Sequence, residues 1–195
     1  MQQKLPINDQ LTVEEYLAMT DTRPAGERWE LIEGVAVLNA SPTNFHQIIA
    51  NNIGNALGNW KQENDVPWVP LLGIGTRVPV SPRSLPQPDI QVLSVQPTEE
   101  SRETKDGLVL FEVMSKSNTR TDQAWRLKAY SSIPNCQHYV TLSQTKPAIS
   151  RYDRTTGWTA VAVTGLRSSL ELPALGVTIP LSLIYRWTPA GETKR

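Results

Sequence analysis

Apolar residues recur along the chain with two different periods, and these periods predict where helices and strands lie. Segment 44–63 is the clearest helix, since its apolar side chains recur every three to four residues and asparagine or glutamine fills the opposite face. A short helix is predicted over 12–19, because Thr12 and Glu15 have the spacing of a capping box. We expect a third helix over 119–133, opened by Asn118 or Thr121.

Extended segments alternate with these helices. Prolines at 70 and 79 place one of them near a sheet edge, because proline cannot donate to a ladder. The strand, strand, helix, strand order over 89–142 predicts a mixed α/β sheet with helices packed on it. The expected extended segments are a hairpin over 28–40 that turns at Glu33-Gly34, then 68–80, 89–95, 108–114 and 137–142, and a hairpin formed by 149–152 and 158–163. The tail, 179–187, is expected to add one short helix.

Composition restricts the class of protein. A chain of 195 residues, of which 39% are apolar and 19% charged, is long and apolar enough for one globular domain over 1–195. The formal net charge is zero, which argues against a strongly basic nucleic-acid binder. The single cysteine, Cys136, excludes an internal disulfide and a thiolate metal cluster. No signal peptide or membrane-spanning run is present, so a cytoplasmic protein is expected.

Two carboxylates interrupt apolar strands. Asp89 follows Pro88 at the start of one strand, and Glu112 lies inside the next strand. If these strands are neighbours, the two carboxylates converge and share a proton or a cation. Oxygen ligands of this kind suit Mg²⁺ or Mn²⁺. The alternative for Glu112 is a structural ion pair, and Asp89 alone reads equally well as a turn residue.

A lysine on the third helix fits the same chemistry. Spacing by three and four places Lys128 on a face with Ala124 and Leu127, which we expect to lie against the sheet. An ammonium there could stabilise developing negative charge or position the attacking water. Lys128 and Glu112 are therefore either two parts of a metal-dependent phosphodiester site or a buried salt bridge.

An ordered series of motifs resembles the Uma-two family, whose members are endonucleases of the PD-(D/E)XK, restriction-endonuclease-like fold. The resemblance covers a core of about 29–152. The motifs are "WELIEG" at 29–34, "QPDIQVLS" at 87–94, "LVLFEVMSKSNTRTDQAWRLKAY" at 108–130 and "IPNCQHYVTLSQ" at 133–144. The resemblance implies a restriction-endonuclease-like core with flanking helices and additional β-hairpins.

The resemblance also implies roles for particular residues. Asp89 and Glu112 would bind the metal, and Lys128 would be the catalytic lysine. Glu30 would be a further ligand or general base, with a solvated strand residue as the alternative. The superfamily motif has lysine two residues after the acid, where this chain has Met114, so the helix-borne Lys128 is the expected replacement.

Four more residues are candidates for substrate binding. His46 opens the long helix and could contact phosphate, although a capping or packing role is the alternative. Ser115 and Ser117 could bond the scissile phosphate, or they could satisfy loop backbone. Lys116 stands where the family has proline and adds a positive charge near the expected phosphate.

The function expected from these residues is hydrolysis of DNA by a divalent-metal-dependent endonuclease that uses Mg²⁺ or Mn²⁺. RNA or branched DNA is not distinguished from DNA by the sequence. The rival hypothesis is a non-catalytic scaffold of the same fold that binds nucleic acid or protein. Restriction-like folds often act as symmetric pairs, so a homodimer is expected. Trp158, Tyr185 and Trp187 are candidate contacts, with a core position as the equal alternative for each.

Overall fold

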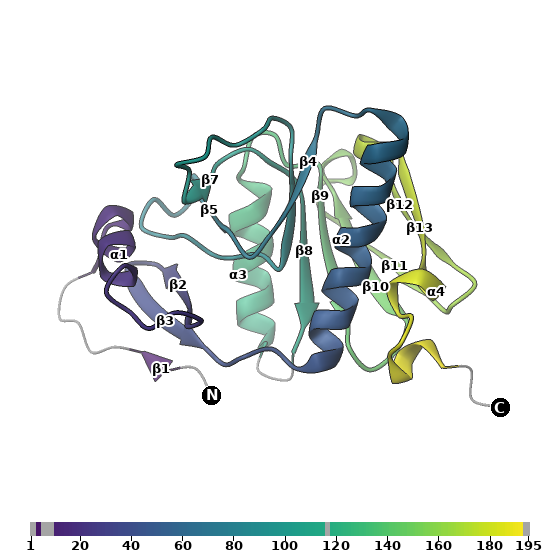
Figure 1. The fold of residues 1–195 in the computed structure, drawn as a ribbon, viewed down its shortest axis with the longest axis horizontal. Helices are drawn as coiled ribbons and strands as arrows, with labels where there is room; N and C mark the ends of the chain where they lie inside the picture. Colours follow the sequence, from purple (N-terminus) through teal and green to yellow (C-terminus); the bar gives the residue numbers. More distant parts are fainter. Residues whose placement is uncertain (1–2, 5–9, 116–117, 193–195) are drawn as a thin grey trace.

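The centre of the protein is a six-stranded mixed sheet, shown in the computed structural model of residues 3–4, 10–115 and 118–192 (Figure 1). Its strands are β4 (Val69–Leu72), β6 (Ile90–Leu93), β8 (Gly107–Met114), β9 (His138–Ser143), β10 (Ala148–Asp153) and β11 (Ala160–Thr164). They lie in the order β11-β10-β9-β8-β6-β4. Strands β8 and β9 are parallel, and helix α3 (Arg120–Ser131) supplies the long crossover that a parallel pair requires. The mixed α/β prediction is confirmed.

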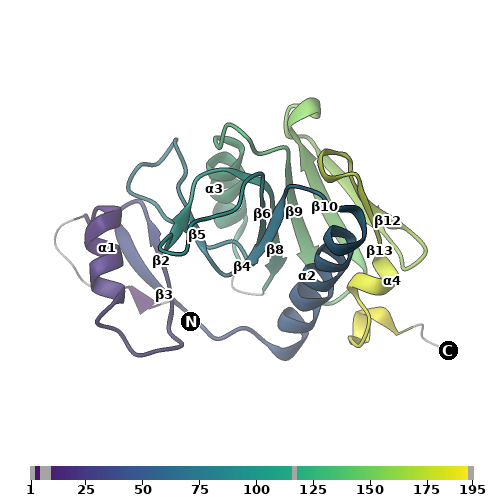
Figure 2. The same ribbon diagram turned by 45° about the horizontal axis from the view of Figure 1, so that its top comes forward.

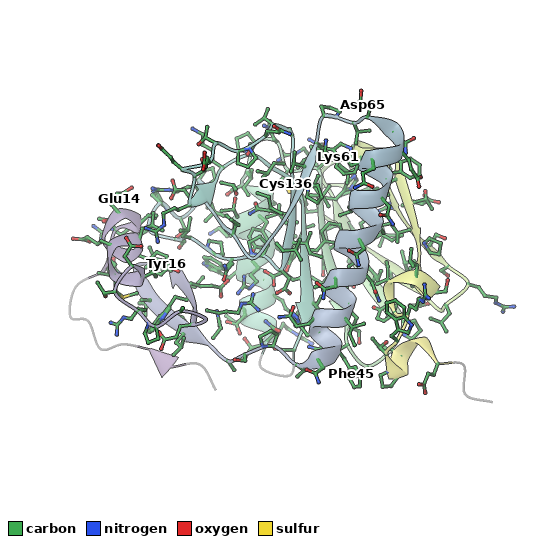
Figure 3. All side chains as sticks on the ribbon, viewed as in Figure 1. Glu14, Tyr16, Phe45, Lys61, Asp65 and Cys136 are labelled. Carbon is green, nitrogen blue, oxygen red and sulfur yellow. The ribbon has the colours of Figure 1, made fainter. Side chains whose placement is uncertain are left out.

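Helix α2 (Asn44–Asn64) packs its apolar stripe on one face of this sheet. The Thr43 hydroxyl caps it by accepting the His46 N–H, and the helix continues to a left-handed residue at Asp65. Ile49, Ile53 and Leu57 recur at helical spacing and are fully buried against the strands. Figure 3 shows the helix from Phe45 at one end to Lys61 and Asp65 at the other.

A C-terminal hairpin extends the core beside α2, and the sequence patterns did not predict it. Strands β12 (Ser169–Leu172) and β13 (Val177–Pro180) lie next to α2, followed by α4 (Leu181–Ile184), the expected short helix (Figure 2). Tyr185 is completely buried here, so of its two predicted positions, interface and core, the structure supports the core. Trp187 is 68% exposed. Short 3₁₀ helices follow β10, β12 and α4 at Arg154–Thr156, Pro173–Leu175 and Pro189–Gly191.

Helix α3 covers the opposite face of the sheet. Its N-cap is Thr119, which forms a capping box with Asp122, so neither Asn118 nor Thr121 opens the helix. Ala129 and Tyr130 pack with Leu110 of β8 and Tyr139 of β9. Leu110 points to this side because alternate residues of a strand face opposite sides of the sheet.

The N-terminal part of the chain forms a separate small layer. Helix α1 (Val13–Thr20) has the predicted capping box, with Thr12 and Glu15. The predicted hairpin is β2 (Arg28–Ile32) and β3 (Val35–Asn39), beside which β1 (Gln3–Lys4) pairs with β3. Glu33 and Gly34 both have positive φ, 50° and 81°, as a two-residue primed hairpin turn requires. Strands β5 (Gly75–Thr76) and β7 (Glu103–Thr104) pair nearby.

This N-terminal layer is joined to the rest of the molecule through its hairpin. Leu31 of β2 bridges Leu85, which precedes β6, and both side chains are buried in one apolar cluster. The contact brings β2 close to the start of β6. Within the described ranges, no helix is long and apolar enough to cross a membrane.

Candidate active site

Asp89 and Glu112 come from neighbouring antiparallel strands, as predicted. The backbone N–H of Asp89 donates to the carbonyl of Phe111 at 3.1 Å, and its Oδ2 accepts the N–H of Val113 at 2.8 Å. Glu112 lies between these two partners on β8, opposite Asp89. The two strands therefore bring both carboxylates to the same end of the sheet.

Asp89 is held in its ionised form. His46 Nε2 lies 3.0 Å from its Oδ2, and Arg28 Nη2 lies 3.3 Å from its Oδ1. Burial opposes the charge on this carboxyl, but hydrogen bonds from His46 and Val113 and the charge of Arg28 lower its pKa below the ordinary value. A carboxylate held in this way is a preformed anion at neutral pH.

Glu112 has the opposite electrostatic character. Its Oε1 accepts hydrogen bonds from Arg126 Nη1 at 2.8 Å and from the Tyr130 hydroxyl at 2.7 Å. Burial, with the nearby carboxylates of Asp89 and Glu30, raises the pKa of Glu112 to about 8 against the opposing effect of Arg126. The protonated form of Glu112 is therefore favoured over a wider pH range than that of an ordinary carboxyl.

Glu30 of β2 is the third buried carboxylate at this place. Arg126 Nη2 donates to both of its oxygens, at 3.0 and 2.8 Å. Asn39 Nδ2 and the backbone N–H of Gln87 complete its shell at 2.9 and 2.7 Å. Burial works against ionisation, but these donors lower the pKa of Glu30. We call Asp89, Glu112 and Glu30 the carboxylate cluster.

Arg126 takes the place beside Glu112 that the sequence assigned to Lys128. Lys128 and Ala124 are exposed, so the face expected to lie against the sheet instead points outward, and that expectation is wrong. The inner face carries Arg126, Ala129 and Tyr130, which have the same three- and four-residue spacing. In the sequence, Ala129 and Tyr130 follow Arg126 by three and four residues, and this spacing was the signal that could have placed Arg126 on the inner face.

The structure describes two of the four candidate substrate-binding residues, His46 and Ser115. His46 is buried against Asp89, and its Nδ1 has no hydrogen-bond partner among the described residues. Ser115 is half-buried, and both its N–H and its hydroxyl donate to Asn118 Oδ1, at 2.6 and 2.8 Å. Lys116 and Ser117 lie outside the described residues.

A comparison with models of protein families shows which family the chain belongs to. The model of the Uma2 (Uma-two) family, described as "Putative restriction endonuclease", matches residues 13–182. The chain belongs to the Uma2 family.

Solved structures agree with this assignment at the level of the fold. A "putative nuclease belonging to DUF820" from Anabaena variabilis ATCC 29413 shares 14% identity with the Uma2 chain described here, with a TM-score of 0.74. The match covers 91% of this chain and 98% of that one. No curated protein sequence matches the chain. The expected nuclease-like fold is confirmed.

The donor set of this Uma2 protein suits a divalent ion. Asp89 and Glu112 supply carboxylate oxygens, and Mg²⁺ is commonly held by one or two carboxylates together with waters and substrate phosphate. No described residues form a group of three or more His, Cys, Asp or Glu side chains arranged to hold a metal ion. The residues therefore fit a two-carboxylate site that water and substrate would complete, rather than a site built only from protein ligands.

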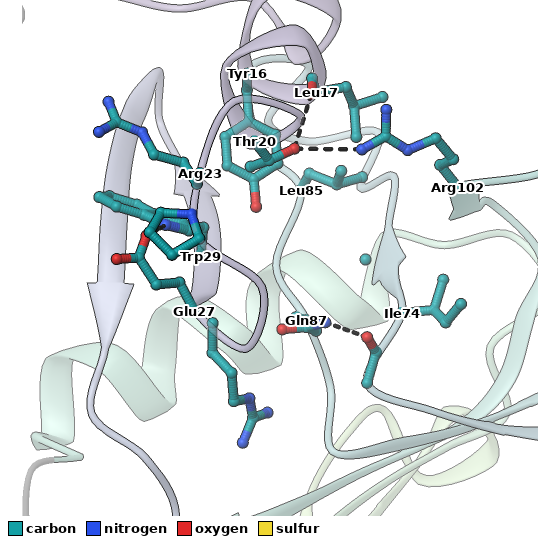
Figure 4. A pocket seen from close by; sticks show the side chains of 14 residues that line it. Tyr16, Leu17, Thr20, Arg23, Glu27, Trp29, Ile74, Leu85, Gln87 and Arg102 are labelled. Carbon is teal, nitrogen blue, oxygen red and sulfur yellow. Dashed lines mark hydrogen bonds between the residues drawn. The ribbon is translucent and has the colours of Figure 1, made fainter.

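A cleft of about 230 Å³ lies between α1, the start of β2 and the β5 segment. Arginines 23, 28 and 102 line it, and Figure 4 shows Arg23 beside Trp29 and Arg102 reaching Thr20. Arg28 also contacts Asp89, and the backbone of Gln87, a second lining residue, contacts Glu30. The cleft and the carboxylate cluster are therefore linked through Arg28 and Gln87, although none of the three carboxylates lines the cleft.

Proposed function

We propose that this Uma2 protein is a nuclease that hydrolyses DNA phosphodiester bonds, with Mg²⁺ or Mn²⁺ held by Asp89 and Glu112. The observation that carries the proposal is the carboxylate cluster, in which three buried acids from distant parts of the chain meet Arg126 and His46. Buried charge of this density is costly to a fold, which favours a functional reason for it.

Each residue of the site has a distinct task in this reaction. When bound, the ion would lower the pKa of a water and neutralise phosphate charge. His46 and Arg28 hold Asp89 ionised and correctly oriented. Glu30 positions Arg126, whose guanidinium can stabilise the charge that develops on the phosphate. Lys128 is exposed on α3, and in this proposal its ammonium does not contact the reacting phosphate.

The substrate class is supported by the arginine-lined cleft, which is linked to the carboxylate cluster. Guanidinium groups bind phosphate oxygens bidentately, and phosphate contacts dominate the affinity of proteins for nucleic acid. Arg23, Arg28 and Arg102 line one cleft. Arg28 pairs with Asp89 and Arg102 with Asp21, whereas Arg23 lies over Trp29, so Arg23 is the first candidate for a phosphate contact. A net charge of zero over the whole chain does not oppose this local concentration of positive groups.

Plasmid cleavage tests the proposal directly. The chain should nick or linearise plasmid DNA in Mn²⁺, and Asp89→Asn should lower the rate by at least the 10²- to 10³-fold typical of losing one electrostatic stabiliser. Asp106→Asn, whose carboxylate accepts the Ser94 hydroxyl elsewhere, serves as the control. Parallel reactions on RNA and branched DNA separate the substrates.

The second candidate is the non-catalytic scaffold, and one observation favours it. Each carboxylate of the cluster already has a cationic or imidazole partner within the protein. Binding of DNA without cleavage of DNA or RNA in either Mg²⁺ or Mn²⁺ would support the scaffold and overturn the nuclease.

A homodimer, in which each site would cut one strand, remains part of the proposal. Exposed Trp187, stacked under the Arg186 guanidinium at 4.2 Å, is a candidate contact. Light scattering at micromolar concentration should report twice the 21.7 kDa chain mass. A monomer throughout that range would contradict it.

A further inference from the structure

The guanidinium of Arg126 lies between two buried carboxylates that belong to different layers of the fold. Nη1 donates to Glu112 on the central sheet at 2.8 Å, while Nη2 donates to Glu30 on the N-terminal hairpin. The Arg126 side chain is only 13% exposed. Because arginine does not lose its proton in proteins, the cluster contains a permanent internal cation.

This internal cation and a divalent ion need the same ligand. Glu112 Oε1 accepts both Arg126 and the Tyr130 hydroxyl, so this oxygen is already used by the protein and an ion would bind through the other oxygen, Oε2. An ion bound at Glu112 would also stand beside the guanidinium charge, and like charges repel strongly where water is excluded. This repulsion favours one cation at Glu112 at a time.

We propose that Arg126 is an exchangeable counter-ion, which competes with the divalent ion for Glu112 and must release this carboxylate before the ion binds. The proposal rests on the proposed function, since it takes Asp89 and Glu112 as the ion's ligands. Glu30 keeps Arg126 in the site during the exchange, because it holds Nη2 with both oxygens. Glu30 is therefore a positioning residue for Arg126 and not a metal ligand.

The released half of the guanidinium then has a partner in the substrate. Nη1 would be left without Glu112 while Nη2 stays on Glu30, and a phosphate oxygen is the natural acceptor for a free guanidinium N–H. Tyr130 keeps its 2.7 Å bond to Glu112 and holds this carboxylate in place. Loading of the ion and of the phosphate would therefore be coupled through Arg126.

Binding of Mn²⁺ alone to the full chain tests the competition. At pH 8.5, calorimetric titration should give a Kd at least about tenfold lower for Arg126→Met than for the parent chain. Arg126→Gln keeps amide donors but lacks the charge, so it should show the same gain if the methionine variant does not fold. Adding Glu112→Gln to either variant should remove the gain.

Arg154→Met is the matched control. Arg154 is also a half-buried arginine, but its guanidinium donates to the backbone carbonyls of Cys136 and Ile133 and contacts no member of the carboxylate cluster. Its Mn²⁺ affinity should equal that of the parent. Equal affinities for the parent and the Arg126 variants would overturn the competition, and so would a gain that persists without Glu112.

The two proposals fail in different ways. A gain in Mn²⁺ affinity in a chain that cleaves no nucleic acid would retain the exchange at Arg126 and reject the nuclease. Cleavage by the parent, combined with unchanged Mn²⁺ affinity in the Arg126 variants, would retain the nuclease and reject the exchange.

Discussion

Helices α2 and α3 cover opposite faces of one sheet but bury different chemistry against it. Helix α2 places Ile49, Ile53 and Leu57 on the strands, and all three are fully buried. Helix α3 places Arg126 and Tyr130 there, both bonded to Glu112. The first interface is an ordinary hydrophobic core, while the second combines an apolar cluster with a buried charged network.

The difference separates the residues that stabilise the fold from those available for chemistry. Apolar burial contributes roughly 25 cal/mol per Å² and depends little on pH or ions. A buried ion pair contributes little net stability, because desolvation offsets the attraction between the charges. The Arg126 network on α3 should therefore respond to pH and metal, whereas the apolar stripe of α2 should respond only to changes in packing.

The largest effect is expected for Arg126→Met. Deleting the guanidinium leaves Glu30 and Glu112 buried without a cation, so the free energy of unfolding should fall by about 3–5 kcal/mol in metal-free buffer. Urea denaturation in chelator measures this loss. A change below about 1 kcal/mol would mean that the network does not hold α3 on the sheet.

Ile53→Ala tests the other face. It should lower the free energy of unfolding by about 2–5 kcal/mol through lost burial and a residual cavity. In Mn²⁺ the difference in stability between Ile53→Ala and the parent should stay the same, because the ion stabilises both chains equally. Recovery by the ion would contradict the division of tasks between the two helices.

The pH dependence of stability should isolate Glu112. The pKa of Glu112 is about 8 in the folded state and 4.5 in the unfolded state, so the folded state binds more protons between these two pH values. This contribution to stability is fully present below about pH 4.5 and is lost as pH rises through 8. The Glu112→Gln variant should therefore gain more than about 1 kcal/mol relative to the parent between pH 5 and pH 8.

Denaturation curves at several pH values provide this comparison. Asp89 and Glu30 have lowered pKa values, so their contributions are lost only as pH falls below the ordinary carboxyl range and do not enter the interval from 5 to 8. A constant difference between Glu112→Gln and the parent across that interval would contradict a protonated Glu112.

The smallest effect on stability is expected for Lys128→Met. Its side chain lies on the exposed face of α3, so the free energy of unfolding should change by no more than about 0.5 kcal/mol. Cleavage should fall less than it does in Arg126→Met. A 10²- to 10³-fold loss of cleavage without loss of stability would return the catalytic role to Lys128.

The sequence by itself determined the elements whose signals are local. The α2 stripe, the capping box at Thr12 and the turn at Glu33-Gly34 were predicted correctly, because each depends on side chains within a few residues of one another. The neighbouring strands of Asp89 and Glu112 also followed from the order of strands and helix, since consecutive strands usually pair.

Only the tertiary structure decided how α3 is rotated on the sheet. Local periodicity offered two faces, and the smaller, less charged one containing Lys128 was chosen wrongly. The face with Arg126 is buried because Glu112 and Glu30, which are 14 and 96 residues away in sequence, supply the charge that makes burial of a guanidinium possible. A long-range electrostatic partner of this kind leaves no local pattern, so the buried position of Arg126 became visible only when the three segments met.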